Sequence, residues 1–305
     1  MNAPADAMPE ALAARRAAPA AAPAARPMYW SVRRELWEYR SIYVAPLAVA
    51  AVFLLGFSIS LIRLPGKMRA AMALDPVRQH ALIMQPYHLS AMAIMATMVI
   101  VVLLYCLEAL TGERRDRSIL FWKSLPVSDR TSVLAKASIA LLVIPLLTCV
   151  IVVATQLVML VLSSVVLLAS GLSVTTMWAQ VFQMSLMLLY HILTVHVLWY
   201  APIYGWLLLV SAWARRAPFL WASLPLLAIG IVEKLAFDTA HFAALLESRL
   251  KAGPEAVLAT ARSLPIDPGT HITPGTFLAS PGLWLGLVVT AAFLAAAVRL
   301  RRTRG

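Results

Sequence analysis

Six long apolar runs constrain this chain more than any other feature of its sequence. A helix needs roughly 20 apolar residues to cross the hydrocarbon core of a bilayer, and each run is long enough. Hydrophobic residues make up 61% of the sequence and charged residues 13%, a composition foreign to soluble domains. We therefore predict an all-α membrane protein with six transmembrane helices. The predicted spans are 42–62, 89–110, 133–168, 178–214, 217–237 and 281–300.

The third and fourth runs are longer than one crossing requires, so each might be thought to contain two helices. Neither run contains the cluster of Gly, Pro and Asn that a hairpin turn needs. We therefore predict one helix for each run. Pro145 and the Pro202/Gly205 pair are interpreted as kinks, which a helix bundle tolerates when neighbouring groups bond the freed carbonyls.

The first part of the chain divides into a tail and an interfacial helix. Residues 1–27 are rich in Ala and Pro and lack the continuous apolar core of a signal peptide; we predict a flexible cytosolic tail, with the transmembrane domain over 28–305. An amphipathic helix is predicted over 28–41, lying along the membrane surface. Its apolar stripe, which Arg33 and Arg40 interrupt, consists of Met28, Tyr29, Val32, Leu36 and Tyr39.

The net charge of +12 raises the question of nucleic-acid binding. In a protein with several spans, such an excess usually belongs to the cytosolic loops. Placing both chain ends in the cytosol puts 18 of the 26 Lys and Arg residues on that side, so we predict an N-in, C-in topology and no nucleic-acid partner. Cys106 and Cys149 fall inside apolar runs and are interpreted as buried apolar side chains. On the outer side, residues 238–252 are predicted to form a short amphipathic helix.

The loop between spans two and three combines full charges with bulky apolar side chains. Exposed apolar side chains gain about 1.5–3 kcal/mol each when they are buried. The segment therefore either docks on another protein, with its charges as a polar rim, or lies on lipid headgroups; the residues alone leave both readings open. The candidate docking residues are Glu113, Arg114, Arg115, Asp116, Arg117, Ile119, Leu120, Phe121, Trp122 and Leu125.

Residues 108–137 resemble the cytoplasmic loop between the second and third spans of ABC-2 type transporter permeases. In that family an acidic residue, a short apolar segment and a turn similar to S-L-P-V-S lead into a long helix with a lysine near its start. The likeness extends to the "RRELWEYRS" segment and the six spans. The positions that carry the match are Glu113, Ser118, Leu120, Ser124, Leu125, Pro126, Val127, Ser128 and Lys136.

This resemblance implies the membrane half of an ATP-driven transporter in a bacterial plasma membrane, with export the expected direction. The family pairs two permease chains, identical or related, with two ATPase subunits. The short helix in this loop is the coupling helix that inserts into the ATPase, so the resemblance assigns residues 113–125 to that contact. ATP and Mg²⁺ would be bound by the ATPase, and no cofactor is expected in this chain.

Other sources of energy and other activities have weaker support in the sequence. No G-x-x-x-x-G-K-[ST] motif is present, since Met68 follows Gly66-Lys67, so we do not expect this chain to be its own ATPase. ATP hydrolysis is expected in a separate partner subunit, and this chain is not expected to be an enzyme. A proton-coupled transporter needs ionisable groups deep in the membrane, whereas Glu108 and Glu233 lie near span ends. Glu108 is expected to bond to arginines of the loop. A membrane anchor or sensor that docks a cytosolic protein is the remaining alternative.

Polar residues inside the third and fourth spans are candidates for a substrate path, although bonding between helices explains them equally well. These candidates are Gln156, Gln183 and His191. His191 and His196 are five residues apart, which places them about 140° apart around an α-helix. One-helix chelation uses residues four apart, so no metal site is predicted. Glu233 and Lys234 are interpreted as a pair at the membrane surface.

Overall fold

The computed structural model describes residues 25–115, 128–251, 277–278 and 280–304. Across these ranges the chain is helical, without β-strands. Six of its helical segments are long and apolar enough to cross a membrane, so the prediction of a helical, multi-pass membrane protein is confirmed. The segments are Ser41–Ala71, Pro76–Arg115, Asp129–Ala169, Thr175–Trp199, Pro218–Phe237 and Pro281–Thr303.

The helices fall into three groups along the chain. Before residue 116 lie α2 (Ala25–Glu38), α3 (Ser41–Ser60), the 3₁₀ turn η2 (Leu61–Arg63), α4 (Leu64–Ala71), α5 (Pro76–Glu108) and α6 (Thr111–Arg115). Next come α8 (Asp129–Ser138), the π-helix η3 (Ile139–Val143), α9 (Ile144–Ala169), α10 (Thr175–His191), the π-helix η4 (Ile192–Trp199) and α11 (Ala201–Trp213). The last are α12 (Pro218–Phe237), α13 (His241–Lys251) and α16 (Pro281–Arg304).

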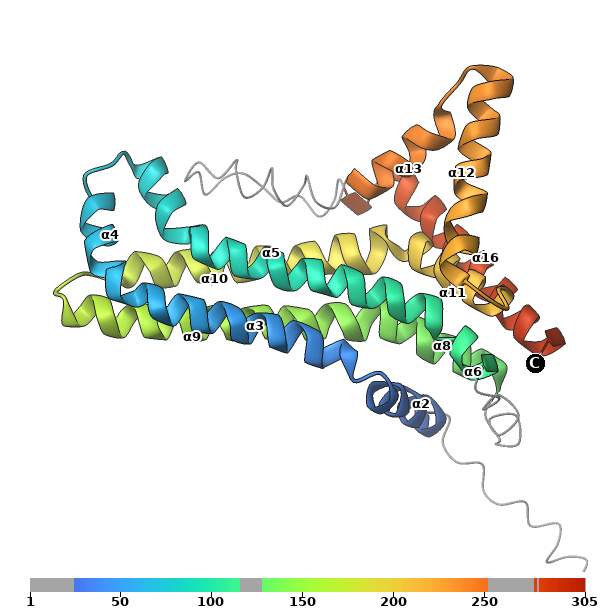
Figure 1. The fold of residues 1–305 in the computed structure, drawn as a ribbon, viewed down its shortest axis with the longest axis horizontal. Coiled ribbons are helices and arrows are strands. Elements are labelled where there is room, and N and C mark those ends of the chain that lie inside the picture. Colours follow the sequence, from blue (N-terminus) through green and yellow to red (C-terminus); the bar gives the residue numbers. More distant parts are fainter. Residues whose placement is uncertain (1–24, 116–127, 252–276, 279, 305) are drawn as a thin grey trace, which may run out of the picture.

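The long helices α3, α5, α9 and α10 lie alongside one another and form the body of the molecule (Figure 1). At one end of this bundle lie α2, α6 and α8, and at the other lies α4. Helix α2 runs across the bundle rather than along it, because the chain turns at Tyr39 and Arg40 before α3 begins. Helix α11 packs against α5 and α16, while α12 leaves the bundle and α13 returns toward α16.

The second span begins earlier than the sequence predicted. We expected it to start at residue 89, after a loop, but α5 already begins at Pro76. Proline is well suited to the first turn of a helix, because its fixed φ is helical and no partner is needed for the missing N–H. Hydropathy identifies only the apolar part of this helix, because its first turns contain the polar residues Arg78, Gln79 and His80.

The third apolar run is one continuous helical segment, as predicted. The π-helix η3 joins α8 to α9, and Pro145 lies in the first turn of α9. Proline cannot donate a backbone hydrogen bond and crowds the preceding turn. A stretch of bonds between residues five apart, as in η3, is the local adjustment that such positions often show.

The fourth run is divided, contrary to the prediction of a single helix. The backbone bends at Tyr200, and α11 then begins with Pro202 in its first turn. Gly205 does not lie at this bend. A Cβ added there would come within 3.3 Å of the Thr290 side chain, so Gly205 allows α11 and α16 to pack closely. The predicted kink therefore lies next to Pro202. Gly205 contributes to the contact between α11 and α16 and not to the kink.

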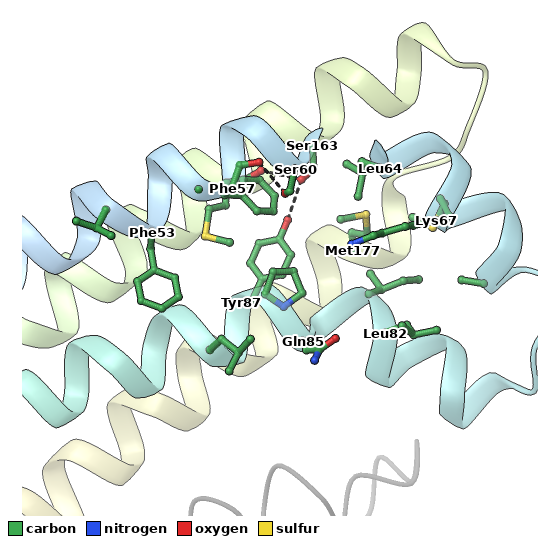
Figure 2. Close-up of a pocket in the computed structure, with 18 residues that line it drawn as sticks. Phe53, Phe57, Ser60, Leu64, Lys67, Leu82, Gln85, Tyr87, Ser163 and Met177 are labelled. Atoms are coloured by element: carbon green, nitrogen blue, oxygen red, sulfur yellow. Dashed lines mark hydrogen bonds between the residues drawn. The ribbon is translucent and has the colours of Figure 1, made fainter. Parts of the chain in front are cut away.

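At the end of the bundle where α4 lies, a cavity of about 500 Å³ opens between α3, α4, α5, α9 and α10 (Figure 2). Its lining is largely apolar. The side chains of Tyr87 and Ser163 meet inside it.

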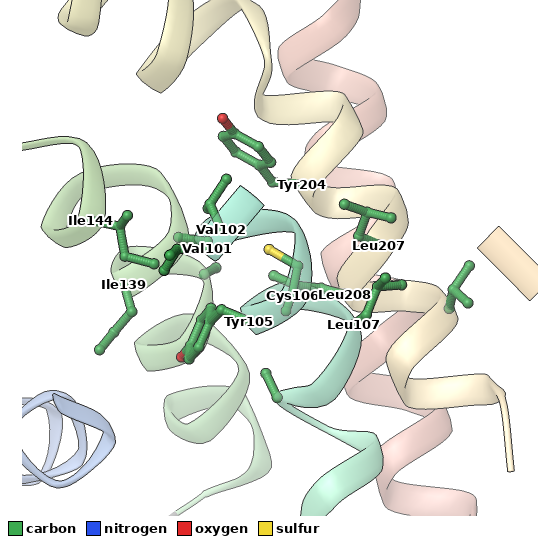
Figure 3. Packing of buried hydrophobic residues seen from close by; sticks show 14 of the residues in the cluster. Val101, Val102, Tyr105, Cys106, Leu107, Ile139, Ile144, Tyr204, Leu207 and Leu208 are labelled. Atoms are coloured by element: carbon green, nitrogen blue, oxygen red, sulfur yellow. The ribbon is translucent and has the colours of Figure 1, made fainter. Parts of the chain in front are cut away.

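The main core lies toward the opposite end, where α5 is packed between α8–α9 on one side and α11 on the other (Figure 3). Tyr105 and Cys106 of α5 are almost fully buried in it. Within a bilayer, lipid is as apolar as leucine, so close van der Waals packing of this kind holds the helices together. Cys106 and Cys149 are both buried and free, which agrees with their predicted role as small apolar side chains.

Candidate functional site

Four segments that are distant in sequence meet where residues 116–127 connect α6 to α8 (Figure 1). Each segment contributes one buried charged side chain. They are Glu35 from α2, Glu113 from α6, Lys136 from α8 and Arg301 from α16. We call these four residues the charge cluster.

Lys136 bridges the two carboxylates of the charge cluster. Its Nζ lies 2.7 Å from Oε1 of Glu35 and 3.2 Å from Oε1 of Glu113. The Lys136 side chain is only 2% exposed. An isolated ammonium group is very costly to bury, and the contacts of Lys136 with the two carboxylates offset this cost.

Arg301 contacts the second oxygen of Glu113. Its NH1 lies 2.6 Å from Oε2 of Glu113, and its Nε lies 3.0 Å from Oδ1 of Asp129. Arg34 also approaches Glu113, at 3.9 Å. Since Glu113 precedes residues 116–127 and Asp129 follows them, Arg301 holds both ends of that connection.

Two tyrosines complete the surroundings of Glu35. The hydroxyl of Tyr105 donates a hydrogen bond of 3.0 Å to Oε2 of Glu35, and the Tyr39 ring packs edge-on against Tyr105. Burial, and then the negative charges of nearby carboxylates, raise the pKa of Tyr39. Its phenol therefore stays neutral and adds no charge to the cluster.

The carboxylates in this region are paired with cations. Paired buried charges stabilise a fold only modestly compared with apolar packing, but removing one partner is strongly destabilising, because the other charge is left buried. Such a cluster fixes the relative position of the segments that carry it. The carboxylates are Glu35, Glu38, Glu113 and Asp129, and the cations are Lys136, Arg301 and Arg34.

Helical periodicity explains why Glu35 and Arg301 are buried. Glu35 lies three residues after Val32 and four before Tyr39, so it continues the stripe of α2 that faces the bundle. Arg301 follows the fully buried Ala297 by four residues in α16. Our sequence analysis did not identify either residue, although a charged residue on an apolar stripe was the available signal.

A second set of hydrogen bonds attaches α6, which precedes residues 116–127, to α11. The hydroxyl of Ser211 accepts hydrogen bonds from the backbone N–H groups of Leu110 and Thr111, at 3.0 and 3.1 Å. The Thr111 hydroxyl donates to the Ser211 carbonyl at 2.9 Å, and the Arg114 guanidinium donates to the same carbonyl. These bonds satisfy N–H groups that the first turn of a helix such as α6 leaves without partners.

After residues 116–127, helix α8 begins with an N-cap residue, Ser128. Ser128 is in extended conformation, and its hydroxyl accepts a hydrogen bond of 3.1 Å from the backbone N–H of Thr131. Serine at this position supplies an acceptor for one of the free donors of α8. Ser128 is among the positions that carry the resemblance to ABC-2 permeases, and its local role here is to start α8.

The structure describes three of the ten candidate docking residues. Glu113 is buried in the charge cluster rather than lying at the surface. Arg114 bonds to α11, and the exposed Arg115 pairs with Glu108 at 3.2 Å, as expected for Glu108. The remaining seven lie outside the described residues. They are Asp116, Arg117, Ile119, Leu120, Phe121, Trp122 and Leu125.

The candidate substrate-path residues do not form one group. Gln156 is buried, with its side chain 3.5 Å from the carbonyl of Tyr87 and 3.4 Å from the Ser185 hydroxyl. Gln183 is exposed on α10, and His191 is half-buried nearer η4. Gln156 thus bonds between helices, and a path formed by all three residues stays a prediction.

The geometry of the two histidines differs from the expectation. We predicted that His191 and His196 point about 140° apart, as on an α-helix. In the structure their rings are 5.5 Å apart, because the bonds of η4 join residues five apart and bring such residues to the same face. The described residues contain no group of three or more His, Cys, Asp or Glu side chains that could hold a metal ion.

Glu233 and Lys234 are not paired with each other, contrary to our interpretation. Lys234 pairs with Asp238 at 2.7 Å. Glu233 accepts hydrogen bonds from the backbone N–H groups of His241 and Phe242, at 2.7 and 2.9 Å. A carboxylate at the start of a helix is favoured by the free N–H groups there, so Glu233 helps to begin α13.

Comparison with known proteins identifies no relatives: no family model, no curated protein and no solved structure matches this chain.

Proposed function

We propose that this chain is the permease subunit of an ATP-driven transporter of the ABC-2 type, working with a second permease chain and two ATPase subunits. The resemblance of residues 108–137 to the family's cytoplasmic loop supports this assignment. The charge cluster is the observation that carries it. Its ion pairs join both ends of the segment 116–127 to the helices α2 and α16. A segment that an ATPase moves must be attached firmly in this way to pass the movement to the helices.

The charge cluster offers a mechanical route from an ATPase to the bundle. Movement of the segment 116–127 would be passed to α5 through α6 and to α9 through α8. Lys136 and Arg301 keep these helices together at their base. The π-helix η3 begins three residues after Lys136. Such π-helical stretches are frequent at functional sites, and η3 is the point at which α9 can bend relative to α8.

The proposed topology places both chain ends and the segment 116–127 in the cytosol of a bacterium, with export as the direction of transport. The distribution of Lys and Arg supports this orientation. The contacts of Glu35 with Lys136 and of Arg301 with Glu113 add support, because they bring α2 and the end of α16 to the same end of the bundle. ATP and Mg²⁺ bind to the partner ATPase.

A copurification experiment tests this proposal. The ATPase is isolated with the wild-type chain and with the double variant Phe121→Asp, Trp122→Asp. Two large apolar anchors contribute about 2 kcal/mol or more each at an interface, so the variant should retain less than a tenth of the ATPase. Arg302→Asp, an exposed charge change at the end of α16, is the matched control. Equal retention by the double variant and the wild type would refute the docking assignment.

Two other functions would use the same features differently. An anchor or sensor would bind its cytosolic partner through residues 116–127 without transport, so ATP-dependent export by the reconstituted complex separates it from a permease. A proton-coupled transporter needs a titratable group facing the interior of the bundle. Glu108 instead is half-exposed and paired with Arg115, and Glu233 caps α13, which favours the ATP-driven alternative.

A further inference from the structure

The cavity is lined by residues of α4, and α4 lies at the end of the bundle opposite to α6 and α8, which carry Glu113 and Lys136 (Figure 1). The cavity volume of about 500 Å³ is within the usual range of small-molecule sites, roughly 300–1,000 Å³. The walls come from the second half of α3, from α4, from the first half of α5, and from α9 and α10. Neither the charge cluster nor the residues of the proposed ATPase contact take part in it.

The three hydroxyl groups that line the cavity already have hydrogen-bond partners within the protein. The Tyr87 hydroxyl and the Ser163 hydroxyl lie 3.2 Å apart and bond to each other. Ser163 also donates to the carbonyl of Met159, and Ser60 donates to the carbonyl of Phe57. Most of the remaining wall is apolar, with Phe57 and Met177 among the labelled side chains, and the exposed Gln85 and Lys67 add polar groups to the lining (Figure 2). An apolar chain therefore fits this interior better than a polar solute, which would lose its hydrogen bonds to water.

The cavity opens toward the lipid-facing surface of the bundle. Val52 of α3 and Leu82 and Leu89 of α5 line it and are about half to two-thirds exposed, at 67%, 51% and 49%. A large apolar side chain that is exposed on a membrane-spanning helix faces the lipid. A molecule already in the bilayer can therefore enter sideways, without crossing water.

Among the described residues that line the cavity, Lys67 is the charged one. It lies at the rim and is exposed, in a short helix that also carries Arg69. Lys67 has no ion-pair partner in the part of the chain that the structure describes, and the nearby Asp75 is paired with Arg78 at 3.5 Å. The rim is therefore positively charged and favours a negative headgroup.

We propose that this cavity binds one acyl chain of an anionic phospholipid, with the lipid phosphate against Lys67. Moving an acyl chain from the bilayer into an apolar cavity exchanges one apolar environment for another, so the chain itself provides little selectivity. Selectivity comes from the headgroup, since each basic residue near a membrane surface attracts anionic lipid appreciably. On the proposed topology the lipid belongs to the outer leaflet. Binding needs no ATPase partner.

Native mass spectrometry of the purified full chain, with phosphatidylglycerol or phosphatidylcholine added to the micelles, tests this inference. Gly56 lines the cavity, and a Cβ added there meets no atom within 4 Å, so Gly56→Leu should fill the space without disturbing the fold. Lys67→Ala removes the rim charge. The matched controls are Gly230→Leu, a glycine of α12 with equally open surroundings, and Arg69→Ala.

The wild type should retain roughly three- to tenfold more phosphatidylglycerol than phosphatidylcholine, since a nearby basic residue contributes a factor of this order. Gly56→Leu should lose both lipids, and Lys67→Ala should lose only the preference. Thermal unfolding of each variant verifies that it is folded. The inference is wrong if Gly56→Leu retains as much lipid as Gly230→Leu, if Arg69→Ala acts like Lys67→Ala, or if inorganic phosphate alone displaces the lipid.

Discussion

Lys136 of α8 and Glu35 of α2 form a buried ion pair of 2.7 Å across a separation of 101 residues. The pair joins the helix that precedes the first span to the helix that opens the third. Because Lys136 also contacts Glu113, a single side chain connects α2, α6 and α8. This end of the bundle thus combines buried ion pairs with the apolar core that packs beside them.

Replacing Lys136 with methionine should destabilise the protein strongly. The substitution leaves Glu35 and part of Glu113 buried without their cation, and losing one partner of a buried pair costs about 3–5 kcal/mol. Thermal unfolding of the detergent-purified protein measures the loss. Lys234→Met is the control, because the Lys234–Asp238 pair is exposed and such pairs contribute only about 0–1 kcal/mol. Equal effects of the two substitutions would contradict a structural role for the cluster.

Arg301→Lys should impair transport even though the charge is retained. Arg301 uses Nε for Asp129 and NH1 for Glu113, and the single ammonium group of lysine cannot reproduce this fork. The two ends of the segment 116–127 would then be joined less firmly. We expect ATPase binding to persist while ATP-dependent transport falls by roughly tenfold, as a loss of about 1.4 kcal/mol in coupling would produce. Arg302→Lys, at an exposed position of α16, should behave as wild type.

The sequence predicted the parts of this fold that depend on hydropathy and local signals. The six apolar segments, the continuous third run and the helix after residue 238 follow from composition and helix breakers. Helix ends were less predictable, because α5 continues into polar sequence as far as Pro76. The fourth run is divided at Tyr200, between the end of the π-helix η4 and the first turn of α11, which contains Pro202. No local sequence pattern determines the residue at which this bend occurs.

The sequence analysis identified two of the four residues of the charge cluster. Glu113 and Lys136 carried the family resemblance, but nothing in their own segments indicated that they contact each other. Glu35 and Arg301 are brought to them by tertiary packing of α2 and α16, at separations that no periodicity describes. A cavity such as the one beside Lys67 is likewise formed by side chains from several helices and has no sequence pattern.

Ser211→Ala should weaken the attachment of α6 to α11. The hydroxyl accepts from two backbone N–H groups, those of Leu110 and Thr111, and leaving a buried donor without a partner costs about 1–3 kcal/mol. The loss should appear as a lower unfolding temperature and as faster hydrogen exchange in residues 109–115. Ser223→Ala is the matched control, since that exposed hydroxyl bonds only within its own helix. Unchanged exchange at residues 109–115 in Ser211→Ala would argue against this anchoring role.

The proposed orientation predicts which cysteine variants react from outside the cell. Cys106 and Cys149 are only 0% and 7% exposed, so the native chain should react little with a membrane-impermeant maleimide. The exposed positions 78 and 216 lie on opposite sides in the proposed topology. Arg78→Cys should therefore be labelled in intact spheroplasts, and Arg216→Cys only after permeabilisation. The reverse pattern would place residues 116–127 outside the cell, where a cytosolic ATPase cannot reach them, and the permease assignment would fail with it.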